Sequence, residues 1–380
     1  MYRFNCLVLI IIAFILSCSE TDDNIYIYHP TQENLNSDVT SALKSEYSIK
    51  SLENNSLKKK IENKKLITSI GNLSEKVPEI FSDIYTVGIT DNELFIFQRG
   101  NFKISVFDFE GNFVKDIHAL GRGPNEVQQP TNITVSNDTL YIVDGFNVKY
   151  IDLTQPNQPI EIFYSSENHR IEDICTLNDK MILRFFSMKM SSGVNEFSIY
   201  HSLNMQSKET ERSFGIPYKA NNIKDSKYLS DGDFVCNEMT DTIVSTMFIL
   251  PYITAYDVRG HIKWNVEVEE FKPILHRQDN VGVGGMSFRW HEDSFQHTSY
   301  TQLLNFNEFV ILQIITFENF LNENDRFQND KLRTDTYLID SETGESEFLG
   351  SVLPRILAIN EHYLITEKDE EFPAIEVFAI

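Results

Sequence analysis

Two stretches of the sequence follow one pattern, and this repetition limits the possible folds more than any other feature. They read LFIFQRGNFKISVFDFEGNFV (residues 94–114) and LYIVDGFNVKYIDLTQPNQPI (residues 140–160). Each has a run rich in β-branched and aromatic residues, a polar turn with an asparagine, and a second run that ends in aspartate before a further turn and strand. The pattern predicts short strands joined by tight turns, arranged as a recurring unit.

The same strand–aspartate–turn–strand unit returns later in the chain. It is clear in YDVRGHIKW (256–264) and LIDSETGESEF (338–348), and fainter in IYHSLNMQSKET (199–210). A last strand of this type is AIEVFAI (374–380). Counting one such strand per unit gives six units, with strands that end near Asp108, Asp152, Ser202, Asp257, Asp340 and Ala379.

The spacing of these units predicts an all-β fold, a six-bladed β-propeller. The first four units follow one another at intervals of about 44 to 55 residues, which suits one four-stranded blade each. The interval from Asp257 to Asp340 is longer, about 83 residues. We therefore expect an insertion there, mainly within residues 270–300 and 318–333.

The sixth unit lacks an outermost strand. The segment KKLITSIG (64–71) reads as a strand and precedes the first complete unit. If it lies beside residues 374–380, it completes the last blade and leaves no open edge in the ring. The sequence therefore predicts a propeller over residues 64–380 whose last blade is closed by an N-terminal strand.

The N-terminus indicates export from the cytoplasm. One cation, Arg3, precedes an apolar stretch over residues 6–16. As a helix this stretch would be about 16 Å long, too short for a bilayer core of about 30 Å. Residues 1–17 therefore predict a signal peptide. The tetrad ILSC (15–18) resembles the bacterial lipobox, which implies cleavage before Cys18 and lipidation of its thiol. An ordinary signal peptide with an incidental cysteine is the alternative.

The residues after Cys18 are polar and predict a tether. The acidic run SETDD (19–23) is similar to the signal that sends lipoproteins of Bacteroidetes to the outer face of the outer membrane, although a solvated linker would read the same way. We expect a tether over residues 18–63, with a helical piece within 39–62. The mature protein is expected to be lipid-anchored in the outer membrane, at the cell surface or otherwise facing the periplasm.

The charge and the motifs exclude some partners. The formal net charge of −23 repels phosphate backbones, so nucleic acid is not an expected ligand. The glycines at 282–285 lack the strand-to-helix context and the spacing of a phosphate loop. No nucleophile elbow is present, and we expect no cofactor.

One stretch carries a more specific resemblance. GRGPNEVQQPTNITVSNDTLYIVDGFNVKYIDL (121–153) is similar to one NHL-type repeat, although Asn125 and Val127 depart from the usual glycine and aromatic residue. We expect Pro130 to begin an inner strand, where no ladder donor is needed. With the leader, the whole chain resembles the six-bladed β-propeller lipoproteins of Bacteroidetes. The residues that match the repeat are Gly121, Gly123, Pro124, Pro130, Asp144 and Asn147.

Candidate ligand contacts lie in the long insertion. The stretch GGMSFRWHEDSFQH (284–297) contains Arg289, Trp290 and His291. A tryptophan and an arginine on a propeller face can stack on sugars or hold a carboxylate. His291 and His297, with the acids between them, could also ligate a metal, but their spacing matches no established pattern, so no metal site is assigned. Ordinary packing of the insertion is the alternative.

Two further arginines are candidates for contact with a ligand. Arg99 and Arg122 could reach an anionic group of a ligand, although a salt bridge to one of the many acids is the alternative.

Cys175 and Cys236 occupy equivalent positions in successive units. Because equivalent positions point the same way round a ring, we expect two buried free thiols.

These features predict a binding protein. The leading hypothesis is an outer-membrane lipoprotein whose propeller binds a partner protein or a glycan without catalysis. The alternative is a metal-assisted lyase or hydrolase built on an NHL-like propeller, because repeats can bring distant histidines and acids together at the axis. A structural or sensory partner of a nutrient-uptake system is a third hypothesis.

Overall fold

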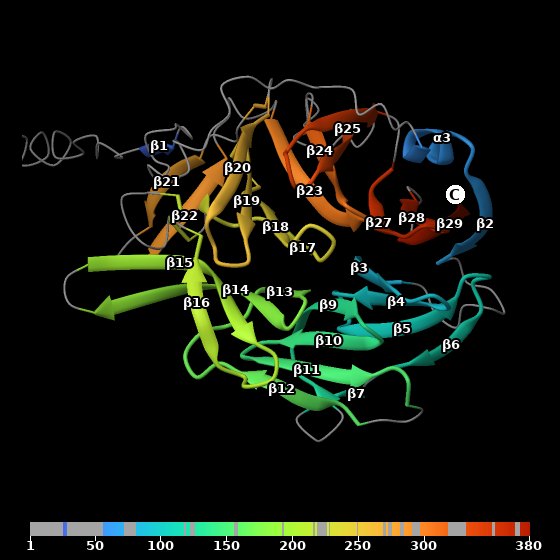
Figure 1. Cartoon of the computed structure of the whole chain (residues 1–380), viewed down its shortest axis with the longest axis horizontal. Coiled ribbons are helices and arrows are strands. Elements are labelled where there is room, and N and C mark those ends of the chain that lie inside the picture. The colour runs from blue at the N-terminus through green and yellow to red at the C-terminus, as the bar shows by residue number, and fades with distance from the viewer. Residues whose placement is uncertain are drawn as a thin grey trace, which may run out of the picture.

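The computed structural model contains six four-stranded sheets that follow one another in chain order around a common centre (Figure 1). Each sheet is one blade of a β-propeller, so the predicted fold class is confirmed. The structure describes residues 26–28, 56–71, 81–117, 119–121, 126–155, 159–191, 194–215, 217–218, 226–227, 229–248, 250–268, 271–272, 276–281, 285–290, 297–317, 332–351, 354–368 and 373–380.

The strands of the first three blades alternate with short turns. Blade 1 has β3 (Ile84–Ile89), β4 (Glu93–Gln98), β5 (Lys103–Asp108) and β6 (Phe113–Asp116). Blade 2 has β9 (Pro130–Ser136), β10 (Thr139–Asp144), β11 (Asn147–Asp152) and β12 (Glu161–Ser165). Blade 3 has β13 (Asp173–Leu177), β14 (Lys180–Ser191), β15 (Val194–Asn204) and β16 (Thr210–Phe214).

The remaining blades repeat this order, except that the last one takes a strand from the N-terminal side. Blade 4 has β17 (Phe234–Asn237), β18 (Thr242–Thr246), β19 (Tyr252–Asp257) and β20 (Ile262–Glu267). Blade 5 has β23 (His297–Phe306), β24 (Phe309–Phe317), β25 (Leu332–Asp340) and β26 (Ser346–Gly350). Blade 6 has β27 (Ile356–Ile359), β28 (Tyr363–Lys368), β29 (Ala374–Ala379) and β2 (Lys65–Ile70).

The first strand of each blade lies nearest the axis. The inner strands β3, β9, β13, β17, β23 and β27 each contact the inner strands of the two neighbouring blades. We call the face of the propeller on which these strands begin the entry face. Because neighbouring strands are antiparallel, the turns between second and third strands lie on this face, as do the connections between blades.

β2 closes the ring by pairing with β29. Lys65 lies opposite Ala379, and Ile70 lies opposite Ile375. This register confirms that the segment predicted over residues 64–71 completes the last blade. Closure covers the edge that blade 6 would otherwise expose.

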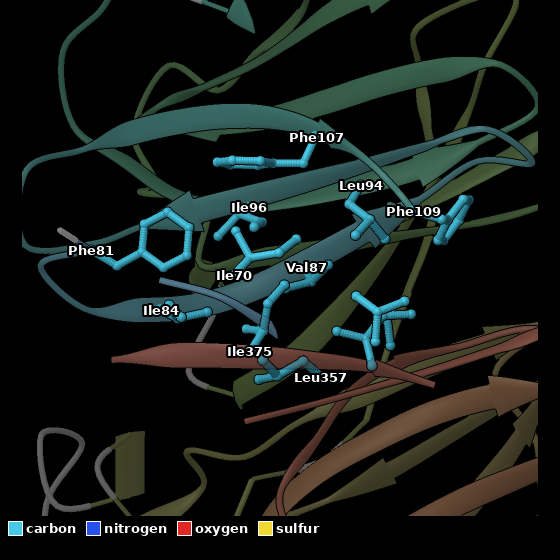
Figure 2. Close-up of a cluster of buried hydrophobic side chains, with 13 residues drawn as sticks. Ile70, Phe81, Ile84, Val87, Leu94, Ile96, Phe107, Phe109, Leu357 and Ile375 are labelled. Carbon is cyan, nitrogen blue, oxygen red and sulfur yellow. The ribbon is translucent and has the colours of Figure 1, made fainter. Parts of the chain in front are cut away.

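The apolar core lies between successive blades. In the cluster between blades 6 and 1, side chains from both sheets interlock (Figure 2). Ile70 of β2 is fully buried there, together with Leu94, Leu357 and Ile375. Burying an aliphatic side chain of this size contributes about 1.5–3 kcal/mol. The closing strand is therefore held by packing as well as by its hydrogen bonds.

The aspartate at the end of the third strand explains the repeated sequence pattern. In blade 1, Oδ1 of Asp108 accepts the backbone N–H of Asn112 at 2.7 Å. In blade 3, Asn204 replaces the aspartate, and its Oδ1 accepts the N–H of Ser207 at 3.0 Å. Such bonds stabilise the tight turn into the fourth strand. The same kind of bond is made by Asp152, Asp257 and Asp340.

The connection from blade 1 to blade 2 contains two short parallel strands, β7 (Ala119–Leu120) and β8 (Glu126–Val127). β9 then begins at Pro130, as the sequence predicts. The carboxylate of Asp144 is buried, and it accepts the N–H groups of Gln128 and Gln129 at 3.0 and 2.6 Å. Nζ of Lys149 lies 2.7 Å from the same carboxylate. These bonds fix the entry of the chain into blade 2.

The long interval before blade 5 contains a hairpin outside the blades, which confirms the insertion expected within residues 270–300. Its strands are β21 (His276–Val281) and β22 (Gly285–Trp290). β1 (Tyr26–Tyr28) pairs with β21 and makes a three-stranded sheet. The second expected insertion, 318–333, lies mostly outside the described residues.

A helix from the segment predicted as tether packs on the propeller. α3 (Ser56–Glu62) precedes β2, and its side chains Leu57 and Ile61 are 2% and 6% exposed. They join the apolar cluster between blades 5 and 6, beside residues such as Phe306 and Leu364. The folded body therefore includes α3. Within the described residues, no helix is long and apolar enough to cross a membrane.

The prediction of two free thiols is wrong. Cys175 and Cys236 form a disulfide, with 5.6 Å between their Cα atoms. They lie on β13 and β17, the inner strands of blades 3 and 4. Equivalent positions do point the same way round the ring, but inner strands converge on the axis. Residues at one height in adjacent blades are therefore close enough to bond.

Candidate ligand-binding site on the propeller axis

Six side chains, one from each blade, gather where the inner strands reach the entry face. We call them the axial cluster. Most stand at or next to the start of an inner strand. In blade 5 the inner strand is longer, and its member lies where the register of β23 shifts. The members are Tyr85, Asn132, Asp173, Asp233, Gln302 and Arg355.

Hydrogen bonds connect members of the axial cluster across blade boundaries. Nδ2 of Asn132 donates to Oδ1 of Asp173 at 2.5 Å, which joins blades 2 and 3. Nε of Arg355 donates to Oε1 of Gln302 at 3.2 Å, which joins blades 6 and 5. Nη2 of Arg355 also donates to the carbonyl oxygen of Tyr85 at 3.1 Å. The cluster is thus built by residues far apart in the sequence.

The two aspartates of the cluster are held by neutral donors. Oδ1 of Asp173 also accepts the N–H of Ile174 at 2.7 Å. Oδ2 of Asp233 accepts the N–H of Leu303 at 2.8 Å, and its Oδ1 accepts that of Phe234 at 2.9 Å. Among the described residues, neither carboxylate forms a salt bridge. Their orientation is fixed, and the guanidinium groups of Arg184 and Arg355 act on their charge from beyond salt-bridge distance.

The electrostatic consequence is a carboxyl group that titrates near neutral pH. Burial, and then the charge of Asp233, raise the pKa of Asp173 to about 7, far above the usual aspartate range. Burial likewise raises the pKa of Asp233. Both side chains are half-buried, so they keep some access to solvent.

Tyr85 lies across the axis from the two acids and is 37% exposed. Burial raises its pKa, and the charges of Asp173 and Asp233 raise it further. Because Tyr85 belongs to blade 1 and the acids to blades 3 and 4, this interaction spans the centre of the propeller. Cζ of Arg99 lies 5.2 Å from the centre of the Tyr85 ring. That geometry fits a cation–π contact.

Arg184 supports the acidic side of the cluster. It lies on β14 opposite Asp173 and is 5% exposed. Its Nη2 donates to Oδ1 of Asp231 at 2.8 Å and to the carbonyl oxygen of Ser230 at 3.3 Å. Nη1 lies 3.9 Å from Glu172. The guanidinium therefore fixes the chain that leads into β17 and Asp233.

This arrangement suits a ligand group that donates hydrogen bonds. Half-buried carboxylates accept bonds from ammonium, guanidinium or hydroxyl groups, and such bonds strengthen where water is scarce. The partly exposed ring of Tyr85 offers a surface for stacking. Among the described residues, no group of three or more His, Cys, Asp or Glu side chains is placed to hold a metal ion.

The candidate ligand contacts predicted from sequence do not all lie at the axial cluster. Arg99 lies on the entry face and contacts the axial cluster through Tyr85. Arg289 and Trp290 are on β22, in the sheet outside the blades. Arg122 and His291 lie outside the described residues, so their proposed roles stay predictions.

Sequence reasoning missed every member of the axial cluster. Their identities differ from blade to blade, so no repeated letter marks them. One signal was available for blades 3 and 4. Asp173 and Asp233 stand two and three residues before the cysteines Cys175 and Cys236, at the starts of strands that the repeat places on the axis.

The family comparison agrees with the architecture. Residues 78–235 match the DUF5128 profile, described as a 6-bladed beta-propeller. The match covers blades 1 to 3 and less than half of the chain. A comparison with curated protein sequences gave no significant match.

Solved structures show the same fold at low sequence identity. A member of the DUF4221 family from Bacteroides vulgatus superposes with a TM-score of 0.53 and 10% identity, covering 83% of this chain and 97% of that chain. A protein from Bacteroides fragilis, described as exported, gives 0.49 and 12%, covering 84% and 95%. Virginiamycin B lyase from Staphylococcus aureus gives 0.42 and 11%, covering 83% and 99%. Sheet topology and the profile together identify the chain as a six-bladed β-propeller.

Proposed function

We propose that this protein is a lipid-anchored binding protein of the bacterial envelope, and that its axial cluster receives a partner protein or a glycan. One observation carries the proposal: two half-buried aspartates, Asp173 and Asp233, stand at the axis, and no cation of the described residues forms a salt bridge with them. A donor-rich group of a ligand supplies what these carboxylates lack. Lysine or arginine side chains and sugar hydroxyls have that chemistry.

The anchor places the propeller near a membrane surface. Lipidation of Cys18 would tether the chain, and β1 begins at Tyr26, only a few residues further on. At about 3.5 Å per residue, this short link keeps the sheet of β1, β21 and β22 within about 30 Å of the lipid. The net charge of −23 would keep the body away from anionic headgroups and favour a basic or neutral partner.

The binding proposal is tested with the full-length protein in detergent. Pull-down from solubilised envelopes and a glycan array should each be run with the wild type, with Asp173→Asn/Asp233→Asn, and with Asp91→Asn. Asp91 is exposed in the turn between β3 and β4, on the face opposite the entry face, so it controls for loss of charge. A ligand held equally by all three proteins would place the binding site elsewhere.

The anchor is tested separately by fractionation. Cys18→Ala should release the protein from the membrane pellet, because acyl chains supply most of the membrane affinity. A variant that stays in the pellet would contradict lipidation at Cys18.

An enzyme is the second candidate, and one observation favours it. A carboxyl group with a pKa of about 7 beside a second carboxyl, as in Asp173 and Asp233, is suited to general acid–base catalysis. The metal-assisted lyase or hydrolase expected as the alternative would need metal ligands besides these two residues. Turnover of a bound ligand that stops in Asp173→Asn, with binding retained, would favour this candidate over pure binding.

A further inference from the structure

A cavity separate from the axial cluster lies between blades 2 and 3. Its volume is about 500 Å³, within the range of small-molecule sites. The wall on the blade 2 side comes from the end of β12 and the connection to β13, with Tyr164, Ser166 and His169. β14, β15 and β16 of blade 3 supply the opposite wall. The connection from β12 to β13 crosses the entry face, so the cavity opens on the same side as the axial cluster.

An irregularity in β14 builds the floor of this cavity. The pairing of β14 with β15 shifts between Arg184 and Ser187, so the strand bulges at Phe185. Bulges free a carbonyl from the ladder and redirect side chains, and they are common beside binding sites. Here the freed carbonyl oxygen of Phe185 lies 3.0 Å from Nε2 of His201. The bulge therefore brings the Phe185 carbonyl oxygen to a histidine that lines the cavity.

The hydrogen bonds of His201 set its tautomer. A carbonyl oxygen only accepts, so Nε2 donates to Phe185. In the neutral ring, Nδ1 then accepts from Oγ of Ser213, which lies 2.8 Å away. His201 is 2% exposed, and bonds at both nitrogens hold its ring in place.

Three flat side chains stack at the floor. The ring of Phe185 lies 3.8 Å from that of His201, with 8° between the planes. The ring of His169 lies 5.2 Å from that of Phe185, with 9° between the planes. The backbone N–H of His169 donates to Oγ of Ser166 at 3.1 Å, which holds the connection in place. The stack exists before any ligand arrives, which lowers the entropic cost of binding.

The charges around the cavity do not favour an ionic ligand. Arg212 donates from Nη1 to the carbonyl oxygen of Arg259 at 2.5 Å. Glu211 is paired with Lys180 at 2.5 Å. Glu167 also lines the cavity and is exposed, so the lining carries charges of both signs at its edge. Hydroxyl and amide groups make up most of the other polar lining. Ser198 on β15 and Asn168 in the connection are among them.

We propose that this cavity binds a neutral sugar ring, at a site distinct from the axial cluster. The C–H face of the sugar lies against the ring of His169, the least buried member of the stack, and its hydroxyls bond to the serine and asparagine side chains of the walls. The proposal does not depend on what the axial cluster binds.

The test uses the full-length protein in detergent and a panel of methyl glycosides of neutral hexoses and N-acetylhexosamines. Binding is followed by saturation-transfer difference NMR and quantified by calorimetry. His169→Ala should weaken binding of the recognised glycoside about tenfold, the cost of losing one ring contact. Ser198→Ala, which is less disruptive to packing, should also weaken it. His362→Ala is the matched control, because that histidine is exposed in the turn between β27 and β28.

Three outcomes would overturn the proposal. One is that no neutral glycoside binds to the wild type while its near-ultraviolet circular dichroism shows an intact fold. Another is that His169→Ala and Ser198→Ala bind as well as the wild type. The third is that Asp173→Asn/Asp233→Asn abolishes glycoside binding while His169→Ala does not, which would place the sugar at the axial cluster.

Discussion

Cys175 and Cys236 are joined by a disulfide across the gap between blades 3 and 4, although 61 residues separate them in sequence. Asp173 begins β13, the strand of Cys175, and Asp233 directly precedes β17, the strand of Cys236. The bond therefore limits how far blades 3 and 4, and with them Asp173 and Asp233, can move apart. A covalent link so close to the candidate site ties its geometry to the redox state of the compartment.

The disulfide makes a direct prediction about oxidised protein. Peptide mapping without reduction should recover the segments containing Cys175 and Cys236 as one linked species. The variant Cys175→Ala/Cys236→Ala should lose about 2–4 kcal/mol of unfolding free energy, because the unfolded chain is no longer constrained. Recovery of both segments as free thiols from protein kept under oxidising conditions would contradict the assignment.

Ring closure predicts a large difference between two positions on β2. Ile70→Ala should cost about 2–5 kcal/mol of unfolding free energy in a urea titration, because its side chain is fully buried between blades 6 and 1. Leu66→Ala is the matched control: its side chain is 55% exposed, and the change should cost at most about 0.5 kcal/mol. Equal effects at the two positions would mean that β2 does not close the ring in solution.

The fold could be predicted because its signals are local. The aspartate found in most of these turns bonds to backbone two to four residues away, so the motif is visible as a short pattern, as at Asp108 and Asp257. The strand that completes the sixth unit could also be found, because one strand-like segment before Ile84 belonged to no other unit. Counting units and finding the missing strand were sufficient to predict closure.

The site could not be predicted because its members come from six different blades, and only the closed ring of blades brings them close together. Asn132 bonds to Asp173, and Arg355 reaches the carbonyl oxygen of Tyr85 across the join between the last and first blades. No spacing in the sequence marks such contacts. The same reason explains the wrong expectation for the cysteines, which rested on side-chain direction and ignored how closely inner strands approach.

The ion pair between Asp144 and Lys149 predicts that the losses of unfolding free energy from mutating the two residues are not additive. Asp144→Ala should destabilise the protein by about 3–5 kcal/mol, because it removes the carboxylate paired with the Lys149 ammonium and the acceptor of two backbone N–H groups. The ammonium then keeps only the carbonyl oxygen of Glu126, at 2.6 Å. Adding Lys149→Met removes the uncompensated charge. The double variant should therefore lose less than the two single losses together in thermal or urea unfolding. Strict additivity would show that the pair is not coupled.

The raised pKa of Asp173 predicts how stability depends on pH. The folded protein binds this proton more tightly than the unfolded chain, where an aspartate titrates near 3.9. The stabilising effect is therefore complete below about pH 4 and is lost as the pH rises through about 7. Urea unfolding across this window should show a steeper loss of stability in the wild type than in Asp173→Asn. The same slope in both proteins would contradict the assignment.

The central claim, that the carboxylates of the axial cluster bind the ligand, is tested most directly by the pH dependence of affinity. Once a ligand has been captured, its Kd should be measured between pH 5.5 and pH 8.5 for the wild type and for Asp173→Asn. A protonated Asp173 has no charge and one acceptor oxygen fewer for a donor group of the ligand. Affinity should therefore rise with pH, up to tenfold per pH unit, below the pKa of about 7 and level off above it. Asp173→Asn should bind weakly without that slope. A wild-type affinity that is independent of pH, or a slope that persists in Asp173→Asn, would contradict the claim.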